Sequence, residues 1–206
     1  MVQYFLRGGP FMWPILAVFV FGLAFVLERF ITLSISSVNT KKFIMKVTKA
    51  LSDGGADAAM QLCSSTRGPV ASVFGAGLMR MHRGVDQVEK GIMNTGQVEL
   101  AFLEKNLVWL STSIAVAPML GFLGTVWGMT IAFDAIAAAN DISPAIVANG
   151  ISQALLTTVF GLIVALIMQV FNNYFIARID KIVADMQESS MEFVETLIDF
   201  EQKGQK

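Results

Sequence analysis

The stretch ISPAIVANGISQALLTTVFGLIVALIMQVFNNYFIA, residues 142–177, contains no charged side chain over its 36 residues. About 20 predominantly apolar residues are enough for a helix to cross the hydrocarbon core of a bilayer. The stretch is therefore predicted to form a transmembrane helix. It is unusual for such a helix, because Gln153, Thr157 and Thr158 place an amide and two hydroxyls within six residues. The role of these polar side chains is the main question that the sequence raises.

Two further uncharged stretches, residues 8–27 and 106–133, are also long enough to span a bilayer. The composition agrees, with 54% hydrophobic and 15% charged residues, whereas soluble domains carry about 25% charge. The first stretch exceeds the core of a secretory signal and ends at Glu28-Arg29 without a small-residue cleavage site, so we expect it to be retained. The predicted fold class is an all-α membrane protein with three transmembrane helices, the second and third extended into the cytoplasm, plus short cytoplasmic helices.

Basic residues are distributed unevenly around the three stretches, and this predicts the orientation of the chain. Ten of the 15 Lys and Arg residues lie between the first and second stretches, four follow the third, and none lies between the second and third. Positive charge accumulates on the cytoplasmic side of membrane proteins. We therefore expect a periplasmic N-terminus (1–10), transmembrane helix 1 (11–29), a cytoplasmic helical region (30–105), transmembrane helix 2 (106–135), a short periplasmic loop (136–146), transmembrane helix 3 (147–176) and a cytoplasmic helical tail (177–206).

The region after the first span is predicted to begin with short helices. Hydrophobic residues recur at helical spacing over 41–51, with Asn39 or Thr40 as a possible cap and the Ser-Asp-Gly-Gly sequence 52–55 as the stop. Further short helices are expected over 56–63 and 70–82.

Longer helices are predicted next to the second and third spans. From about Asp86 the chain has no stop signal before Pro118, which predicts one helix that runs from the cytoplasm directly into the second span. Helical spacing of hydrophobic residues over 176–200 predicts that the third span continues as a helix almost to the C-terminus.

Small and polar residues form a row along one side of the second span and another along the third. Residues four apart lie almost above one another on a helix, so each row marks a helical face. Small residues let helix backbones approach closely, and Gly124 and Gly128 have the GxxxG spacing of packed transmembrane helices. The rows are Ala117, Gly121, Gly124, Gly128, Ala132, Ala135 and Ala139 in the second span, and Asn149, Gln153, Thr157, Gly161, Ala165, Gln169 and Asn173 in the third.

Two interpretations of these rows are open from the residues alone. In the first, the rows pack helices together, with hydroxyls and amides as interhelical hydrogen bonds. In the second, they line a hydrated ion path. Packing would be satisfied by Gly, Ala and Ser, whereas an amide such as Gln153 needs several partners or water. The packing candidates are Pro118, Gly121, Gly124, Gly128 and Gly161, and the ion-path candidates are Thr125, Gln153, Thr157 and Thr158.

Charge and reactive side chains limit the functions that the chain can perform by itself. No span carries Asp, Glu, Lys or Arg near its centre, where a protein that moves protons alone usually has a titratable group. Either the chain conducts nothing or another subunit supplies the charge. Cys63 and His82 are single, so we predict no catalytic, cofactor-binding or metal site and no enzyme activity. The net charge of −1 gives no reason to expect nucleic-acid binding.

The second and third spans resemble the ExbB/TolQ/MotA family, most closely ExbB and TolQ. The similarity is carried by APMLGFLGTVWGM (117–129), by GISQALLTTVFGL (150–162), by Glu28-Arg29 and by the order of the spans. The resemblance implies a non-enzymatic motor subunit of the bacterial inner membrane without a cofactor. It also implies a homopentamer around a single-span ExbD/TolR-like partner, present as a dimer, that brings a membrane-embedded Asp. Flow of H⁺ or Na⁺ would then drive mechanical work on a TonB- or TolA-like protein for outer-membrane transport or integrity.

The resemblance also implies roles for individual residues. Thr125 and Thr158 match the family's pore threonines, whose hydroxyls could coordinate an ion or hold water beside the partner's Asp. Pro118 matches a proline expected to kink the second span. Gln153 stands where ExbB and TolQ commonly have Glu, and an amide cannot titrate. A proton-relay role is therefore lost at this position, and the path would suit Na⁺ as well as H⁺.

An alternative function belongs to a different class. The chain would be a passive membrane scaffold that packs and stabilises a partner helix through its small-residue rows and conducts no ions.

Overall fold

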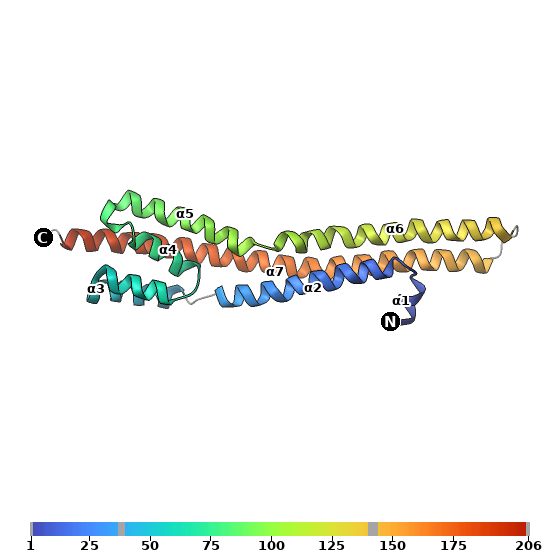
Figure 1. The fold of residues 1–206 in the computed structure, drawn as a ribbon, viewed down its shortest axis with the longest axis horizontal. Coiled ribbons are helices and arrows are strands. Elements are labelled where there is room, and N and C mark those ends of the chain that lie inside the picture. Colours follow the sequence, from blue (N-terminus) through green and yellow to red (C-terminus); the bar gives the residue numbers. More distant parts are fainter. Residues whose placement is uncertain (1, 37–39, 140–143, 205–206) are drawn as a thin grey trace. The chain divides into compact units, whose positions relative to one another are not determined.

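The structure is a computed structural model that describes residues 2–36, 40–139 and 144–204, and its regular elements within these ranges are all helical (Figure 1). Three helical stretches are long and apolar enough to cross a membrane: Met12–Ser36, Val85–Ala138 and Val147–Ile198. These findings confirm the predicted all-α membrane fold. In chain order the elements are α1 (Val2–Arg7), α2 (Met12–Ser36), α3 (Thr40–Ser65), α4 (Pro69–Leu78), the 3₁₀ helix η1 (Met81–Arg83), α5 (Val85–Glu104), α6 (Leu107–Ala139) and α7 (Pro144–Gly204).

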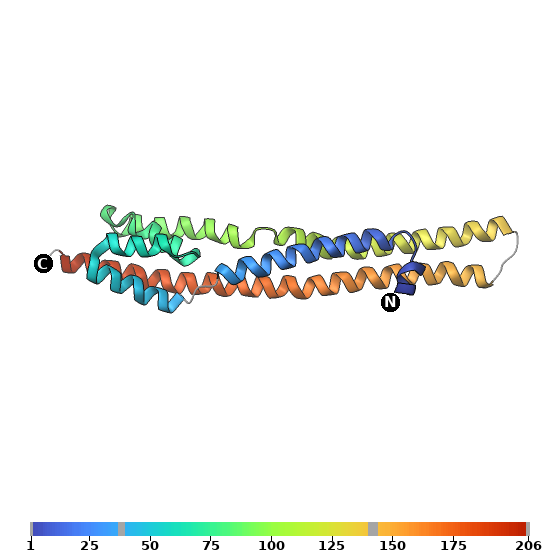
Figure 2. The same cartoon turned by 60° about the horizontal axis from the view of Figure 1, so that its bottom comes forward.

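The chain divides into two compact units. The first, here called the membrane unit, comprises residues 1–29 and 106–174, and the second, the loop-and-tail unit, comprises residues 30–105 and 175–206. Within the membrane unit, α2, α6 and the first part of α7 run side by side in both views of the fold (Figures 1 and 2). The third span does continue into the tail as one helix, because α7 is helical from Pro144 to Gly204.

Close contacts of small residues hold the helices of the membrane unit together. At Gly22 of α2, a Cβ atom would lie 2.9 Å from Sδ of Met168 on α7 and 3.4 Å from Cβ of Ser113 on α6. Nearby, Phe25 stacks on Trp109, with ring centroids 6.3 Å apart. Three helices therefore meet at this level, and aromatic rings fill the space between α2 and α6.

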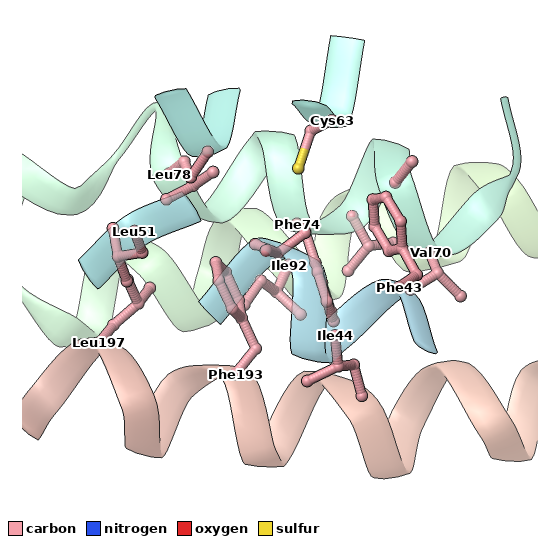
Figure 3. Packing of buried hydrophobic residues seen from close by; sticks show 14 of the residues in the cluster. Phe43, Ile44, Leu51, Cys63, Val70, Phe74, Leu78, Ile92, Phe193 and Leu197 are labelled. Carbon is pink, nitrogen blue, oxygen red and sulfur yellow. The ribbon is translucent and has the colours of Figure 1, made fainter. Parts of the chain in front are cut away.

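The loop-and-tail unit has its own hydrophobic core, shown in Figure 3. Phe74 of α4 stacks on Phe193 of α7 with ring centroids 4.3 Å apart, and on Phe43 of α3 at 6.0 Å. Each contributing helix turns one apolar face inward, as expected for amphipathic helices. The buried core residues are Phe43, Ile44, Val47, Leu51, Ala59, Cys63, Val70, Ala71, Val73, Phe74, Leu78, Val88, Ile92, Met186, Phe193 and Leu197.

The prediction of one helix from about Asp86 into the second span is wrong. The chain leaves the helical conformation at Lys105 and Asn106, where φ of Asn106 is +68°, so α5 and α6 are separate helices within the stretch Val85–Ala138. Asn tolerates the left-handed region better than other side-chain-bearing residues. Its Nδ2 also donates to Oε2 of Glu28 at 3.3 Å, a tertiary contact that the local sequence does not reveal.

Several other element boundaries differ from the expected ones. The first span was expected to end at residue 29, whereas α2 continues to Ser36. The loop expected over 136–146 is helical at both ends, because α6 reaches Ala139 and α7 starts at Pro144. The helices expected over 41–51 and 56–63 are two arms of α3, which kinks at Gly55 with φ +71°. The possible cap at position 39 lies outside the described residues.

Candidate functional site

Helices α6 and α7 pack with their backbones in near contact, and glycines make this possible. A Cβ atom on Gly121 would lie 3.0 Å from the carbonyl oxygen of Thr157, and one on Gly161 would lie 2.6 Å from that of Ala117. A Cβ on Gly128 would lie 3.1 Å from the backbone nitrogen of Ala154. Because the paired residue numbers rise on α6 as they fall on α7, the two helices are antiparallel. Their contact is therefore a glycine-lined seam of the kind known from packed transmembrane helices.

Thr157 lies inside this seam. Its side chain is only 1% exposed, and its hydroxyl donates to the backbone oxygen of Ala154 at 2.7 Å. A Cβ on Gly124 would lie 2.6 Å from Oγ1 of Thr157. Gly124 thus leaves the room that the threonine side chain fills, and Thr157 contributes to packing within the chain.

Thr158 lies at the edge of the seam and is half-buried. Its hydroxyl crosses to α6 and donates to the backbone oxygen of Gly121 at 3.2 Å. Thr125, also half-buried, donates to the backbone oxygen of Phe122 on its own helix at 2.6 Å. A hydroxyl has one hydrogen and two lone pairs. Both threonine hydroxyls donate their hydrogen to a backbone carbonyl, so their lone pairs remain free to accept a hydrogen bond from water or to coordinate a cation.

Thr125 and Thr158 lie on the same side of the helix pair. Each follows a buried seam residue, Gly124 or Thr157, and one residue advances about 100° around a helix. When two antiparallel helices face each other, the residue that follows a contact residue projects toward the same side of the pair on both helices. The structure therefore places the hydroxyls of Thr125 and Thr158 on one side of the helix pair, whereas the third candidate hydroxyl, that of Thr157, lies inside the seam.

Gln153 is not brought to these hydroxyls. It precedes Thr158 by five residues, which separates the two side chains by about 140° around α7. The structure packs Gln153 against the turn between α1 and α2: a Cβ atom on Gly9, whose φ is +75°, would lie 2.8 Å from the Cδ atom of Gln153. The amide therefore contacts the N-terminal turn of its own chain.

Pro118 lies within α6, and the helix continues through it. Because proline has no N–H group, the carbonyl oxygen one turn earlier, on Ile114, lacks its usual helical donor. Pro118 precedes Thr125 by two turns and is half-buried on the same side of α6.

The membrane unit also has a polar cluster at one end, and its residues were not among the candidate site residues predicted from the sequence. Arg29 is 1% exposed, and its Nε and Nη2 atoms each lie 2.7 Å from a carboxylate oxygen of Glu28. Glu28 also accepts from Asn106 at the α5–α6 break. The sequence pair Glu28-Arg29 was a signal for this cluster, but its connection to Asn106 joins residues 78 apart in the chain.

No group of three or more His, Cys, Asp or Glu side chains that could hold a metal ion occurs in the described ranges. Cys63 is buried in the core of the loop-and-tail unit, and burial raises the pKa of its thiol from 9.0 to about 11.

We expect Cys63 to resist alkylation in the folded chain. At pH 8 only about 0.1% of a thiol with this pKa is ionised, and the thiolate is the reactive form. The neutral thiol is favoured by folding, so its contribution to stability is complete below pH 9 and is lost as the pH rises through 11. Maleimide labelling at pH 8 should be at least about 100-fold slower in the folded chain than in denaturant. Equal rates in both conditions would contradict the buried position.

The structure thus defines a helical membrane protein with a glycine-packed pair of spans and two hydroxyls on one side of that pair. A family model described as the MotA/TolQ/ExbB proton channel family matches residues 65–188. An ExbB homolog from Methanothermobacter thermautotrophicus is 34% identical over 180 residues, which is 87% of this chain and 64% of that relative. The chain belongs to the MotA/TolQ/ExbB proton channel family.

Other relatives cover smaller parts of the chain. The Tol-Pal system protein TolQ of Pseudomonas aeruginosa is 31% identical over 135 residues, which is 60% of this chain and 58% of that relative. The biopolymer transport protein ExbB of Salmonella typhimurium is 41% identical over 71 residues, 34% of this chain and 29% of its own length. The chain therefore spans less than two thirds of each of the relatives described here. The resemblance to ExbB and TolQ drawn from the spans is confirmed.

Proposed function

We propose that this chain is the channel and motor subunit of an ExbB/TolQ-type complex in the inner membrane. Five copies surround a single-span ExbD/TolR-like partner, which is present as a dimer and brings a membrane-embedded Asp. Ion flow down its electrochemical gradient turns one component against the other. The partner then passes mechanical work to a TonB- or TolA-like protein for transport across, or integrity of, the outer membrane.

The observation that carries this proposal is the position of Thr125 and Thr158 on one side of the α6–α7 seam. Both hydroxyls are half-buried and both keep acceptor lone pairs, since their hydrogens bond backbone carbonyls. The glycine seam fixes the two helices closely enough to hold these oxygens in place. An ion passing this side of the pair would meet oxygen ligands without a fixed charge.

The chain's own residues bind and orient the ion, while the partner's carboxylate provides the charge. No Asp, Glu, Lys or Arg occurs in residues 106–133 or 142–177. Gln153 cannot titrate and lies about 140° around α7 from Thr158. The path therefore takes H⁺ or Na⁺ through hydroxyl oxygens and water, without a proton relay at position 153. The chain needs no cofactor and catalyses no covalent reaction.

The orientation follows from the basic residues. The segment between the second and third spans has no Lys or Arg, and four follow the third span. The N-terminus is therefore periplasmic, and both the loop and the C-terminal tail are cytoplasmic.

We expect Thr158→Val or Thr125→Val to reduce gradient-driven ion uptake about five- to 150-fold, because losing one oxygen ligand costs about 1–3 kcal/mol. The measurement is ion uptake into vesicles that contain the chain and its single-span partner, under an imposed H⁺ or Na⁺ gradient. Valine has nearly the same shape as threonine, so the size of the purified complex should not change.

Thr130→Val is the matched control for this experiment. Thr130 is also on α6 and also donates to its own helix, to the carbonyl of Val126 at 2.9 Å. It lies five residues from Thr125 and thus about 140° away around the helix. We expect this variant to keep normal uptake. Full activity of both Thr125→Val and Thr158→Val would remove the pore assignment.

The passive scaffold is the second candidate from the sequence, although the glycine rows that it would use for a partner helix pack α6 against α7 within the chain. A scaffold loses assembly in Gly121→Leu, because the new side chain meets the backbone of Thr157 and Thr158. Its action on the partner is the same with and without an ion gradient. If collapsing the gradient leaves the outer-membrane process unchanged, the scaffold is the correct function.

A further inference from the structure

Two exposed amides occur far along α7, within the uncharged stretch 142–177. Nε2 of Gln169 donates to Oδ1 of Asn173 at 2.8 Å. This bond uses one amide hydrogen of Gln169 and one lone pair of Asn173. The carbonyl oxygen of Gln169 and the amide group of Asn173 keep their capacity for further hydrogen bonds or a cation.

Such a pair does not suit a lipid-facing surface. Hydrocarbon offers no hydrogen-bond partners, and polar side chains within transmembrane helices usually face the bundle interior or a water-filled cavity. In the single chain the pair is exposed and is not covered by α2 or α6. Another subunit, the partner or water must therefore meet it.

The direction of the pair decides between these environments. Gln169 follows Thr158 by eleven residues, which is about three turns plus 20°. Asn173 follows Thr158 by fifteen residues, which is about four turns plus 60°. Both amides thus project within about 60° of Thr158, displaced along the helix by about 16 and 22 Å. Gln153, in the same four-residue row, projects about 140° away from Thr158.

The row of polar residues on α7 is therefore a spiral. Each four-residue step turns about 40° around the helix. Along this spiral Gln153 contacts the α1–α2 turn, Thr157 and Gly161 are buried in the seam, and Gln169 and Asn173 are exposed. Only the last two extend the side on which Thr158 lies.

We propose that Gln169 and Asn173 form a second polar site on the same passage as Thr158, at its inner end. The site binds a hydrated monovalent cation: the Gln169 carbonyl oxygen coordinates the ion or its water, and the Asn173 amide donates to the oxygens of that water. In a homopentamer the pair repeats as a ring. This inference rests on the proposed function, because it extends the same passage.

Water access to the two positions tests the inference directly. Single cysteines replace Gln169, Asn173 or Tyr174 in a Cys63→Ser background, with the chain assembled with its single-span partner in membranes. Tyr174 is 50% exposed and projects about 140° from Gln169 and about 100° from Asn173, so it is the matched control. A membrane-impermeant cationic thiol reagent, applied from both sides, should modify positions 169 and 173 at least about tenfold faster than position 174. Equal rates, or faster modification at position 174, overturn the inference.

Ion uptake provides the second test and separates this inference from the proposed function. Gln169→Leu combined with Asn173→Leu should reduce uptake about tenfold, whereas the exchange Gln169→Asn with Asn173→Gln, which keeps both amides, should retain most of it. If Thr158→Val blocks uptake and the double leucine variant does not, the inference is wrong and the proposed function stands. If Thr158→Val has no effect, the proposed function fails, and the labelling pattern still decides whether the amides face water.

Discussion

Gly161→Ala should destabilise the membrane unit by about 1–3 kcal/mol, although only one methyl group is added. The new Cβ would lie 2.6 Å from the backbone oxygen of Ala117 and 3.2 Å from Cα of Gly121. Backbone atoms of a helix cannot rotate away as a flexible side chain can, so α6 and α7 must move apart. Separation also weakens the hydrogen bond from Thr158 to the Gly121 oxygen. Thermal unfolding of the purified complex in detergent measures the loss.

Gly96→Ala is the matched control for this experiment. Gly96 is also inside a helix, so both substitutions gain the same helix propensity of about 1 kcal/mol. Its new Cβ would lie 3.6 Å from Cε of Met186, which is an ordinary van der Waals distance. We expect this variant to be as stable as the parent or more stable. If the two variants unfold at the same temperature, there is room for a methyl group at position 161, and the close contact with the Ala117 backbone is contradicted.

The same seam shows what the sequence could predict of the site and where it stopped. The glycine row and Thr125 and Thr158 are visible in the sequence, because residue type and four-residue spacing report a helical face. The sequence row treats Gln153, Thr157 and Asn173 as one face. On a real helix the row turns about 40° per step, so its two ends point in different directions. Which part of the spiral is buried depends on where α2 and α6 pack, and that is tertiary information.

The fold was predictable to a similar extent. Long uncharged stretches and helical periodicity were enough for the three apolar helices and for the continuous α7. The break between α5 and α6 was not predictable from local signals, because Asn106 is flanked by good helix formers and has no Pro or Gly beside it. Its left-handed conformation goes with a hydrogen bond to Glu28. A contact between residues so distant in sequence leaves no local pattern.

Phe193→Ala should have the largest effect on the loop-and-tail unit, with a loss of about 3–5 kcal/mol. The ring is fully buried and stacks on Phe74 at a centroid distance of 4.3 Å and an interplanar angle of 11°. The ring of Phe193 also contacts α4 at Gly77, where an added Cβ would lie 3.2 Å from Cε1 of Phe193. Helix α4 therefore packs closely on this ring. Removing the ring leaves a cavity among α3, α4 and α7 that these helices cannot fill without leaving their own contacts.

This loss is a large part of the 5–15 kcal/mol that stabilises an ordinary domain. Limited proteolysis of the complex in detergent should therefore cut residues 30–105 in Phe193→Ala under conditions that leave the parent intact. Met191→Ala is the control, since Met191 lies two residues away on the same helix and is 65% exposed. A surface change of this kind should alter stability by no more than about 0.5 kcal/mol. Equal cleavage of the two variants would mean that the aromatic stack does not hold the tail to the loop helices.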